Sequence, residues 1–357
     1  MIKSSTGEVC SPNDDIKALD LHGTNALRAR LLQIQADSGS GEEALYAEAE
    51  IGIGVEQAAE QAEIDKAQQA LSDFRSYLAQ SPTGSAAQAL PSDSELVYTY
   101  NPATQQCEIT RLDGAPIVLS IAYSGLSGEL LLPPQLMVTE LDCSNNELTT
   151  LPKVLPASLT ALNCNHNQLT SLPEVLPASL SELNCRINQL ATLPELPASL
   201  TSLGCSYNQL TTLPEVLPTS LTVLSCSNNQ LTTLPEVLPA SMTWLDCSYN
   251  QLTTLPELPA NMTKLNCYNN QLTTLPELPA SLTGLYCANN QLTSLPEVLP
   301  ASLTELYCID NQLTKLPEVL PTSLTVLSCS NNPKLRNNPV AQKALQELRD
   351  RGATVRS

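Results

Sequence analysis

The strongest constraint on this chain is a unit that recurs ten times between residues 138 and 332. Each copy reads L-x-x-L-x-C-x-x-N-x-L-x-x-L-P-E-(V)-L-P-A and is 20 or 21 residues long, depending on the optional valine. A unit this short cannot bury a hydrophobic face alone, so the copies must stack on one another. We therefore expect one elongated body here rather than several globular domains.

Spacing within one copy predicts a short strand and a non-helical return segment. In LTALNCNHNQLTSLP (159–173) the strand centres on Leu162 and Cys164, which alternation turns inward with the neighbouring leucines. Two prolines exclude a helix from the return segment and favour extended, polyproline-like chain. This is the leucine-rich-repeat pattern, which predicts a curved solenoid with parallel strands on its concave face.

An asparagine ends each predicted strand. Its amide can donate to and accept from the backbone of neighbouring turns, so we expect this column to join the turns. Its members are Asn146, Asn167, Asn188, Asn208, Asn229, Asn250, Asn270, Asn290, Asn311 and Asn332.

Ten of the twelve cysteines share one position of the unit. Disulfides would need Cβ atoms about 3.5–4.5 Å apart, whereas side chains in register on adjacent strands are about 4.8 Å apart. One thiol per turn does not converge into a metal site, and a leucine-lined interior does not lower a thiol pKa for catalysis. We interpret this ladder as core filling, with no cofactor and no metal. It comprises Cys143, Cys164, Cys185, Cys205, Cys226, Cys247, Cys267, Cys287, Cys308 and Cys329.

The segments before the regular copies predict three further parts. Residues 116–135 form a degenerate first turn of the repeat region 116–332, with Ile121 in the cysteine position and Ser124 in the asparagine position. Residues 95–115 contain two strands around an Asn-Pro turn, which we expect to cap the solenoid. Residues 1–94 are expected to be helical with flexible segments.

Within residues 1–94 we expect two helices. Thr24 can cap the first, and the second carries an apolar stripe at helical spacing. The segments SGSG (38–41) and IGIG (51–54) are typical of linkers. The first helix presents Leu27, Leu31 and Ile34, and the second presents Ile64, Ala67, Leu71, Phe74 and Leu78.

Residues 333–357 predict a C-terminal cap. Asn338 can cap a helix that begins at Pro339 and ends at Gly352. Such covers keep the end of a solenoid core dry. The apolar side of this helix is expected to comprise Val340, Ala344 and Leu348.

The formal net charge of −19 argues against nucleic-acid or anionic-lipid partners, because proteins bind both of these mainly through Lys and Arg side chains. Part of the excess is a column of glutamates after Leu-Pro, interpreted as a solvated edge. No apolar stretch opens the chain and no segment is interpreted as a membrane span, so we expect no cleavable signal peptide. The column comprises Glu174, Glu195, Glu215, Glu236, Glu257, Glu277, Glu297 and Glu318.

Tandem LPEVLPASLTxLxCxxNQLTxLP over residues 138–332 resembles the short-repeat bacterial effectors of the YopM, IpaH, SspH and SlrP group. The resemblance implies export by a bacterium without a signal peptide and action in the host cytoplasm. Part of the group carries a C-terminal ubiquitin ligase with a Cys-x-Asp motif, but only 25 residues follow Asn332. Cys308-Ile309-Asp310 matches that motif by a coincidence of the ladder. The resemblance is therefore closer to YopM-like members without a catalytic domain.

Aromatic side chains cluster among the outward-facing positions of four consecutive turns. They would span about 15 Å of the concave face, at about 4.8 Å per strand. Exposed Trp and Tyr have no folding role there, and these residue types anchor protein interfaces. We call this set the aromatic patch: Trp244, Tyr249, Lys264, Tyr268, Tyr286, Glu305, Tyr307 and Ile309.

These features favour a non-enzymatic effector that binds a host protein on its concave face. Two alternatives stay open. Residues 1–95 can hold an unrecognised activity whose substrate the solenoid selects, although they contain one His (His22) and one Cys (Cys10). The chain can also be a structural or surface protein that self-associates.

Overall fold

The computed structural model describes residues 41–83, 86, 89–102 and 105–357. The chain divides into two compact units. One contains the chain up to Gln80 with Leu90–Ile117 and Leu132–Met137, and the other contains Ser81–Ala89, Val118–Leu131 and Val138–Ser357. The helix expected near Thr24 lies outside the described residues.

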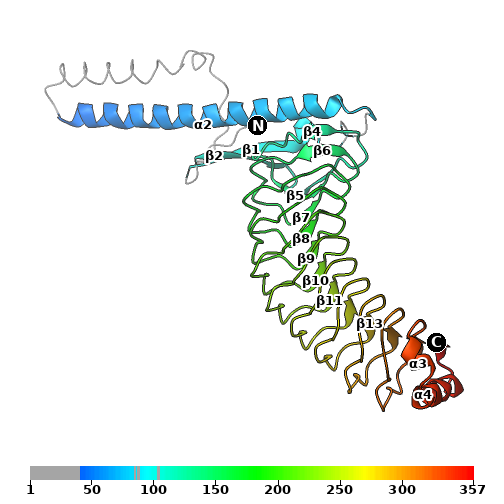
Figure 1. Ribbon diagram of the computed structural model, residues 1–357. Coiled ribbons are helices and arrows are strands. Elements are labelled where there is room, and N and C mark those ends of the chain that lie inside the picture. Colours follow the sequence, from blue (N-terminus) through cyan, green and yellow to red (C-terminus); the bar gives the residue numbers. More distant parts are fainter. Residues whose placement is uncertain (1–40, 84–85, 87–88, 103–104) are drawn as a thin grey trace. The chain divides into compact units, whose positions relative to one another are not determined.

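A long helix and a hairpin form the first unit (Figure 1). Helix α2 (Gly41–Ala79) packs against β1 (Leu96–Asn101) and β2 (Gln106–Arg111), which pair antiparallel as the Asn-Pro turn predicts. A short 3₁₀ helix, η3 (Asp93–Glu95), precedes the hairpin. The apolar stripe predicted for this helix is confirmed, because its members are at most 3% exposed: Ile64, Ala67, Leu71, Phe74 and Leu78.

The linker prediction for IGIG (51–54) is wrong. The segment lies inside α2, which continues for 39 residues. Each glycine costs a helix roughly 1 kcal/mol, and the Ala- and Glu-rich flanks offset that cost.

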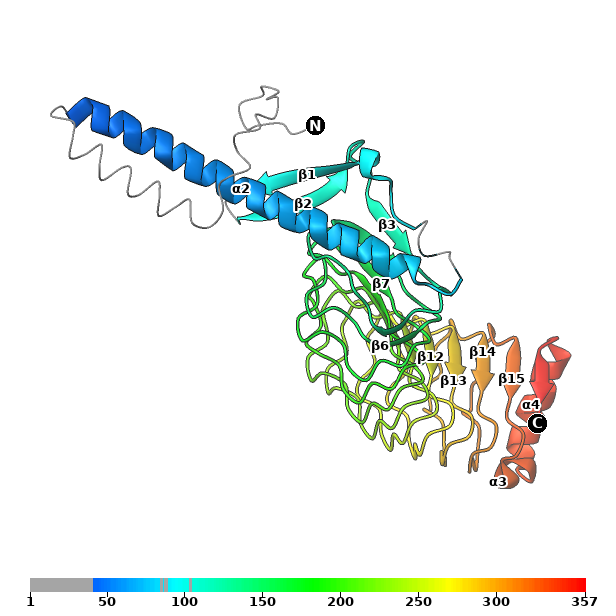
Figure 2. The same ribbon diagram turned by 90° about the horizontal axis from the view of Figure 1, so that it is seen from above.

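The second unit is the expected solenoid. Among the described residues, twelve strands form its sheet in the order β16-β15-β14-β13-β12-β11-β10-β9-β8-β7-β5-β3, so consecutive turns are neighbours (Figures 1 and 2). A second pair, β4 (Ser127–Glu129) with β6 (Glu147–Thr150), is also parallel. The sheet strands are β3 (Ile117–Ser120), β5 (Val138–Asp142), β7 (Ala161–Asn163), β8 (Glu182–Asn184), β9 (Ser202–Gly204), β10 (Val223–Ser225), β11 (Trp244–Asp246), β12 (Lys264–Asn266), β13 (Gly284–Tyr286), β14 (Glu305–Tyr307), β15 (Val326–Ser328) and β16 (Thr354–Arg356).

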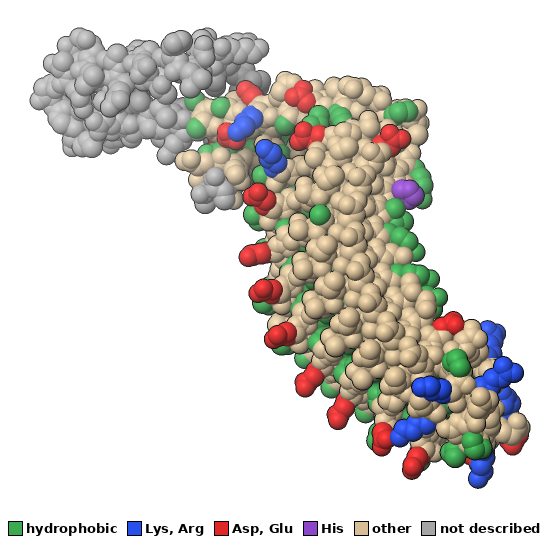
Figure 3. Space-filling view, in the orientation of Figure 1, with side chains coloured by type: hydrophobic (Ala, Val, Ile, Leu, Met, Phe, Trp, Pro, Cys, Tyr) green, Lys and Arg blue, Asp and Glu red, His purple; other side chains and the backbone are tan. Residues whose placement is uncertain are grey.

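The inside–outside assignment of the repeat is confirmed. Leu162 is 2% exposed while its strand neighbours Ala161 and Asn163 are half-buried, and Cys164, which follows the strand, is fully buried. All ten ladder cysteines are at most 2% exposed and none forms a disulfide. The glutamate column is solvent-exposed, and acidic side chains follow one edge of the solenoid in Figure 3.

The asparagine column joins the turns as expected. The side-chain amide of Asn167 donates to the carbonyl oxygens of Cys143 and Cys164, at 3.0 and 3.1 Å. Its Oδ1 accepts from the N–H of Leu148 at 3.0 Å. One buried amide thus satisfies backbone groups of two turns, which explains why the position is asparagine.

The predicted first turn (116–135) is divided in the structure, because Ile117 and Leu132–Met137 belong to the first compact unit. Ile121 and Ser124 are buried, and the N–H of Ser124 donates to Oδ1 of Asn146 at 3.0 Å. The described C-terminal segment contains the short helix α3 (Pro333–Arg336) and the longer α4 (Pro339–Asp350). Strand β16, which the sequence pattern did not predict, extends the sheet by one strand.

The predicted apolar side of α4 is confirmed at Leu348 and wrong at Val340 and Ala344. Val340 is 73% exposed and Ala344 is half-buried, whereas the buried residues are Ala341, Leu345 and Leu348. The rotation of the helix is set by its cap. Oδ1 of Asn338 accepts from two α4 amides, while its Nδ2 donates to the carbonyl of Thr314 at 3.0 Å.

The residue before each ladder asparagine adopts a left-handed backbone, which the sequence reasoning did not predict. Asparagine tolerates this conformation, but a β-branched residue is strained there. Ile187 occupies it with φ 50°, and its side chain is 42% exposed. Replacing Ile187 with Asn should raise the free energy of unfolding by about 1 kcal/mol in urea titrations. Asn228→Ile, at the same position two turns on, should lower it by a similar amount; equal stability of both variants and wild type would contradict the strain.

Candidate functional site

Strand pairing arranges the outward side chains of the concave face in two rows. The first row runs Trp244, Lys264, Gly284, Glu305, because these residues pair across β11 to β14. The second row runs Asp246, Asn266, Tyr286, Tyr307 in the same register. Five members of the aromatic patch therefore lie on adjacent strands, whereas Tyr249, Tyr268 and Ile309 follow the ends of theirs.

The tyrosines of the patch form two pairs. The rings of Tyr249 and Tyr268 meet edge to face with centroids 5.1 Å apart. Those of Tyr286 and Tyr307 stack at 5.3 Å with an interplanar angle of 18°. Contacts between aromatic neighbours restrict their rotamers, so this surface is preorganised.

Tyr286 is also fixed by its phenol, which donates to Glu305 on the next strand. Its ring lies over Gly284, where an added β-carbon would stand 3.1 Å from Cε2. The pKa of Tyr286 is raised to about 12, mainly because the phenol is partly buried and secondly because it donates a hydrogen bond to Glu305. The phenol is therefore protonated at neutral pH and aimed at a carboxylate.

The patch is less exposed than the sequence pattern implies. Trp244 and Tyr249 are 46% and 44% exposed and Lys264 is exposed, whereas the remaining members are half-buried against neighbouring turns. Tyr249 differs from the strand residues because its backbone φ is 51°, at the left-handed position. The aromatics thus do contribute contacts within the solenoid, contrary to the expectation that they have no folding role.

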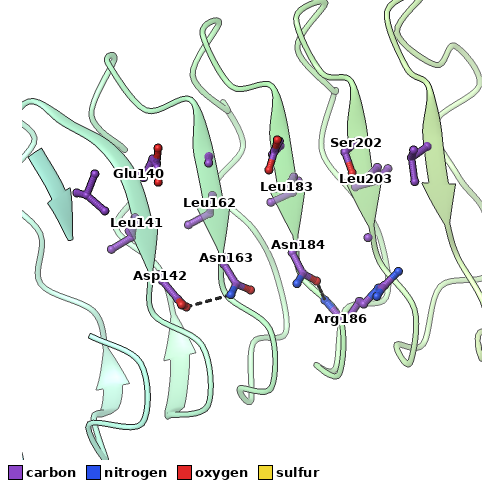
Figure 4. Close-up of a pocket in the computed structure, with 15 residues that line it drawn as sticks. Glu140, Leu141, Asp142, Leu162, Asn163, Leu183, Asn184, Arg186, Ser202 and Leu203 are labelled. Atoms are coloured by element: carbon purple, nitrogen blue, oxygen red, sulfur yellow. Dashed lines mark hydrogen bonds between the residues drawn. The ribbon is translucent and has the colours of Figure 1, made fainter. Parts of the chain in front are cut away.

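A second feature of the concave face was missed. Strands β3, β5 and β7 to β10 line an open hollow of about 390 Å³, and Figure 4 shows Glu140, Asp142 and Arg186 around it. Oδ1 of Asp142 accepts from Nδ2 of Asn163 at 3.0 Å. The available sequence signal was Gly204, which removes a side chain from a column that otherwise carries larger residues.

The Cys308-Ile309-Asp310 triplet is not arranged as a nucleophile. Cys308 is fully buried, and burial raises its thiol pKa well above the ordinary value. Ile309 is half-buried and Asp310 is exposed at the left-handed position. A protonated, buried thiol cannot attack a substrate.

Among the described residues, neither a metal cluster nor a membrane-spanning helix is present. No group of three or more His, Cys, Asp or Glu side chains there is arranged to hold a metal ion. Within the same part of the chain, every helix is too short or too polar to cross a membrane.

Comparison with known proteins agrees with this geometry. The Leucine Rich Repeat family model matches residues 220–240. YopM from Yersinia enterocolitica is 42% identical with a TM-score of 0.53, over 56% of this chain and 43% of that one. YopM from Yersinia pestis is 42% identical with a TM-score of 0.56, over 60% of each chain. No curated protein matches.

The solenoid and the family match together define a leucine-rich-repeat protein, the class of scaffold that presents a curved sheet to a protein partner. Within this class the chain is similar to the two YopM proteins, over 56% and 60% of its own length. The matched region spans 43% and 60% of the lengths of the two YopM proteins.

Proposed function

We propose that this protein is a bacterial effector that binds a host protein on its concave face and acts there as a non-catalytic scaffold. The observation that carries the proposal is the aromatic patch, in which tyrosine pairs and Trp244 form a preorganised, partly exposed surface across four strands. Preorganised aromatic side chains lose little conformational entropy on binding and are common anchors of interfaces.

The comparison supports the effector role. The solved Y. pestis protein is described as a leucine-rich effector protein. We infer that this chain is likewise an effector, and we propose that a bacterium secretes it and that it acts in the host cytoplasm. The ladder thiols support a non-catalytic role, because burial keeps them protonated.

Replacing Trp244, Tyr286 and Tyr307 together with Ala should weaken binding of the captured host protein at least about 100-fold, or about 3 kcal/mol. The partner is first isolated from host-cell lysate on wild-type protein, and its affinity for each variant is then measured by calorimetry. Circular dichroism should show an unchanged fold, because the inward leucines are untouched, together with a small loss of stability from the removed ring contacts.

Tyr123→Ala is the matched control. Tyr123 is 71% exposed in the same solenoid but lies outside the patch. This variant should bind the partner like wild type. If the triple variant also retained wild-type affinity, the aromatic patch would not be the docking surface.

A further inference from the structure

Arg186 lies on the concave face, and its side chain has no hydrogen-bond or ion-pair partner among the described residues. It follows the ladder residue Cys185, and its side chain crosses the adjacent turn at Gly204, where an added β-carbon would lie 3.0 Å from Nε. Among the described residues, Nε is buried with no hydrogen-bond acceptor and no ion pair involves Arg186. A buried charged donor without an acceptor is unfavourable, so the position is suited to an incoming acceptor.

Serine hydroxyls beside Arg186 are also short of an acceptor. Ser206, Ser225 and Ser227 are 2–6% exposed. Oγ of Ser206 is 3.1 Å from Oγ of Ser225 and 3.0 Å from Oγ of Ser227, and it accepts the N–H of Ser227 at 3.2 Å. The three hydroxyl groups have three hydrogens but make only two hydrogen bonds to one another within the described structure. Ser206 accepts from the O–H and the N–H of Ser227, so its own O–H donates to Ser225. The O–H of Ser225 is therefore free to donate to a ligand.

These donors border one hollow of about 280 Å³, which Arg186, Ser225, Ser227 and Tyr249 help to line. Asp246 stands on the same rim, where one of its oxygens accepts from the N–H and O–H of Ser248 at 3.1 and 2.7 Å. Because Tyr249 belongs to the aromatic patch, the hollow is continuous with the proposed docking surface.

We propose that Arg186 and Ser225 form a subsite for the carboxylate of an acidic side chain on the bound protein, an inference that rests on the proposed function. A guanidinium and a hydroxyl can each donate to a carboxylate. A monoanion is favoured over a dianionic phosphate, because a single arginine faces the hollow and Asp246 adds negative charge to its rim.

The test uses the full-length ¹⁵N-labelled protein and follows the Nε–H signal of Arg186 and the amide signal of Ser227. The probes are acetyl-Gly-Glu-Gly-amide, its Gln counterpart, acetate and inorganic phosphate, at constant ionic strength. The Glu peptide should give a saturable shift, with binding at least tenfold tighter than that of the Gln peptide. The exposed Arg336 serves as an internal reference and should not respond.

Two variants complete the test. Arg186→Gln should abolish the response of Ser227, and Ser225→Ala should weaken binding of the Glu peptide about threefold to tenfold through the loss of one hydrogen bond. Equal responses to the Glu and Gln peptides would overturn the subsite. Tighter binding of phosphate, or binding of acetate as tight as that of the Glu peptide, would overturn the assignment to a carboxylate side chain of a protein.

The outcome is separable from that of the docking surface. If Arg186→Gln and Ser225→Ala leave the peptide response intact while the aromatic triple variant loses the host partner, the proposed function stands and the subsite fails. If the peptide response behaves as expected but the triple variant keeps its partner, the aromatic docking surface fails instead.

Discussion

Raising the pH from 8 to 11 should unfold the solenoid steeply. Burial raises the thiol pKa of Cys143, Cys185 and Cys267 to about 12 and that of Cys329 to about 11, and it raises the other ladder thiols well above their ordinary value. In the unfolded chain these thiols ionise near pH 8.5. Above that pH the unfolded state binds fewer protons than the folded state, so the free energy of unfolding falls as pH rises.

The expected magnitude is large. Each thiol contributes about 1.4 kcal/mol per pH unit, so ten contribute roughly 14 kcal/mol per unit between the unfolded and folded pKa values. A domain stability of about 5–15 kcal/mol is exhausted within one or two units. Urea titrations followed by circular dichroism at successive pH values measure the slope. Reaction with a disulfide reagent should be slow at pH 8 and should accelerate in parallel with unfolding.

A control tests whether the ladder is the cause. Replacing Cys226, Cys247 and Cys267 with Ala removes three titrating groups and should lower the slope by about 4 kcal/mol per pH unit. The variant should be less stable at pH 7, since each change leaves a small cavity, but the slope is compared rather than the stability itself. A wild-type stability that stays constant from pH 8 to 10.5 would mean that water reaches the thiols in the folded state.

Replacing a ladder asparagine should be among the most damaging single changes in the chain. The amide of Asn250 donates to the carbonyls of Cys226, Cys247 and Ser248 at 3.0–3.1 Å, and its Oδ1 accepts from the N–H of Leu231 at 3.0 Å. Asn250→Ala removes all of these bonds. Each carbonyl keeps another donor, from Asn229, Asn270 or Asn228, but the buried N–H of Leu231 loses its acceptor. The free energy of unfolding should therefore fall by about 2–4 kcal/mol in urea titrations at pH 7.

Asn250→Asp distinguishes the contribution of the donated hydrogen bonds to stability from that of side-chain packing. The aspartate keeps the size and the acceptor but turns a carboxylate toward three carbonyl oxygens, so it should destabilise more than alanine. The neighbouring exposed amide gives the matched control, and Gln251→Ala should change stability by less than about 0.5 kcal/mol. Equal stabilities of the Ala and Asp variants would show that the donated hydrogen bonds matter less than the packing of the side chain.

The aromatic patch was partly predictable. Strand register follows from the repeat period, so the rows containing Trp244 and Tyr286 could be placed from the sequence alone. Which neighbour each ring contacts could not, because this depends on rotamers that the adjacent turns select. The phenol of Tyr286 reaches Glu305 because Gly284 lacks a side chain beneath its ring.

By itself the sequence determined the solenoid, the buried cysteine ladder and the joining role of the asparagines. Each follows from a spacing that repeats in every turn. The same positions of all ten copies must therefore face the interior. Only the tertiary structure decided the rotation of α4, the left-handed backbone at Ile187 and the placement of Arg186 across Gly204. These features depend on single contacts between particular turns, and a contact that occurs once leaves no periodic signal in the chain.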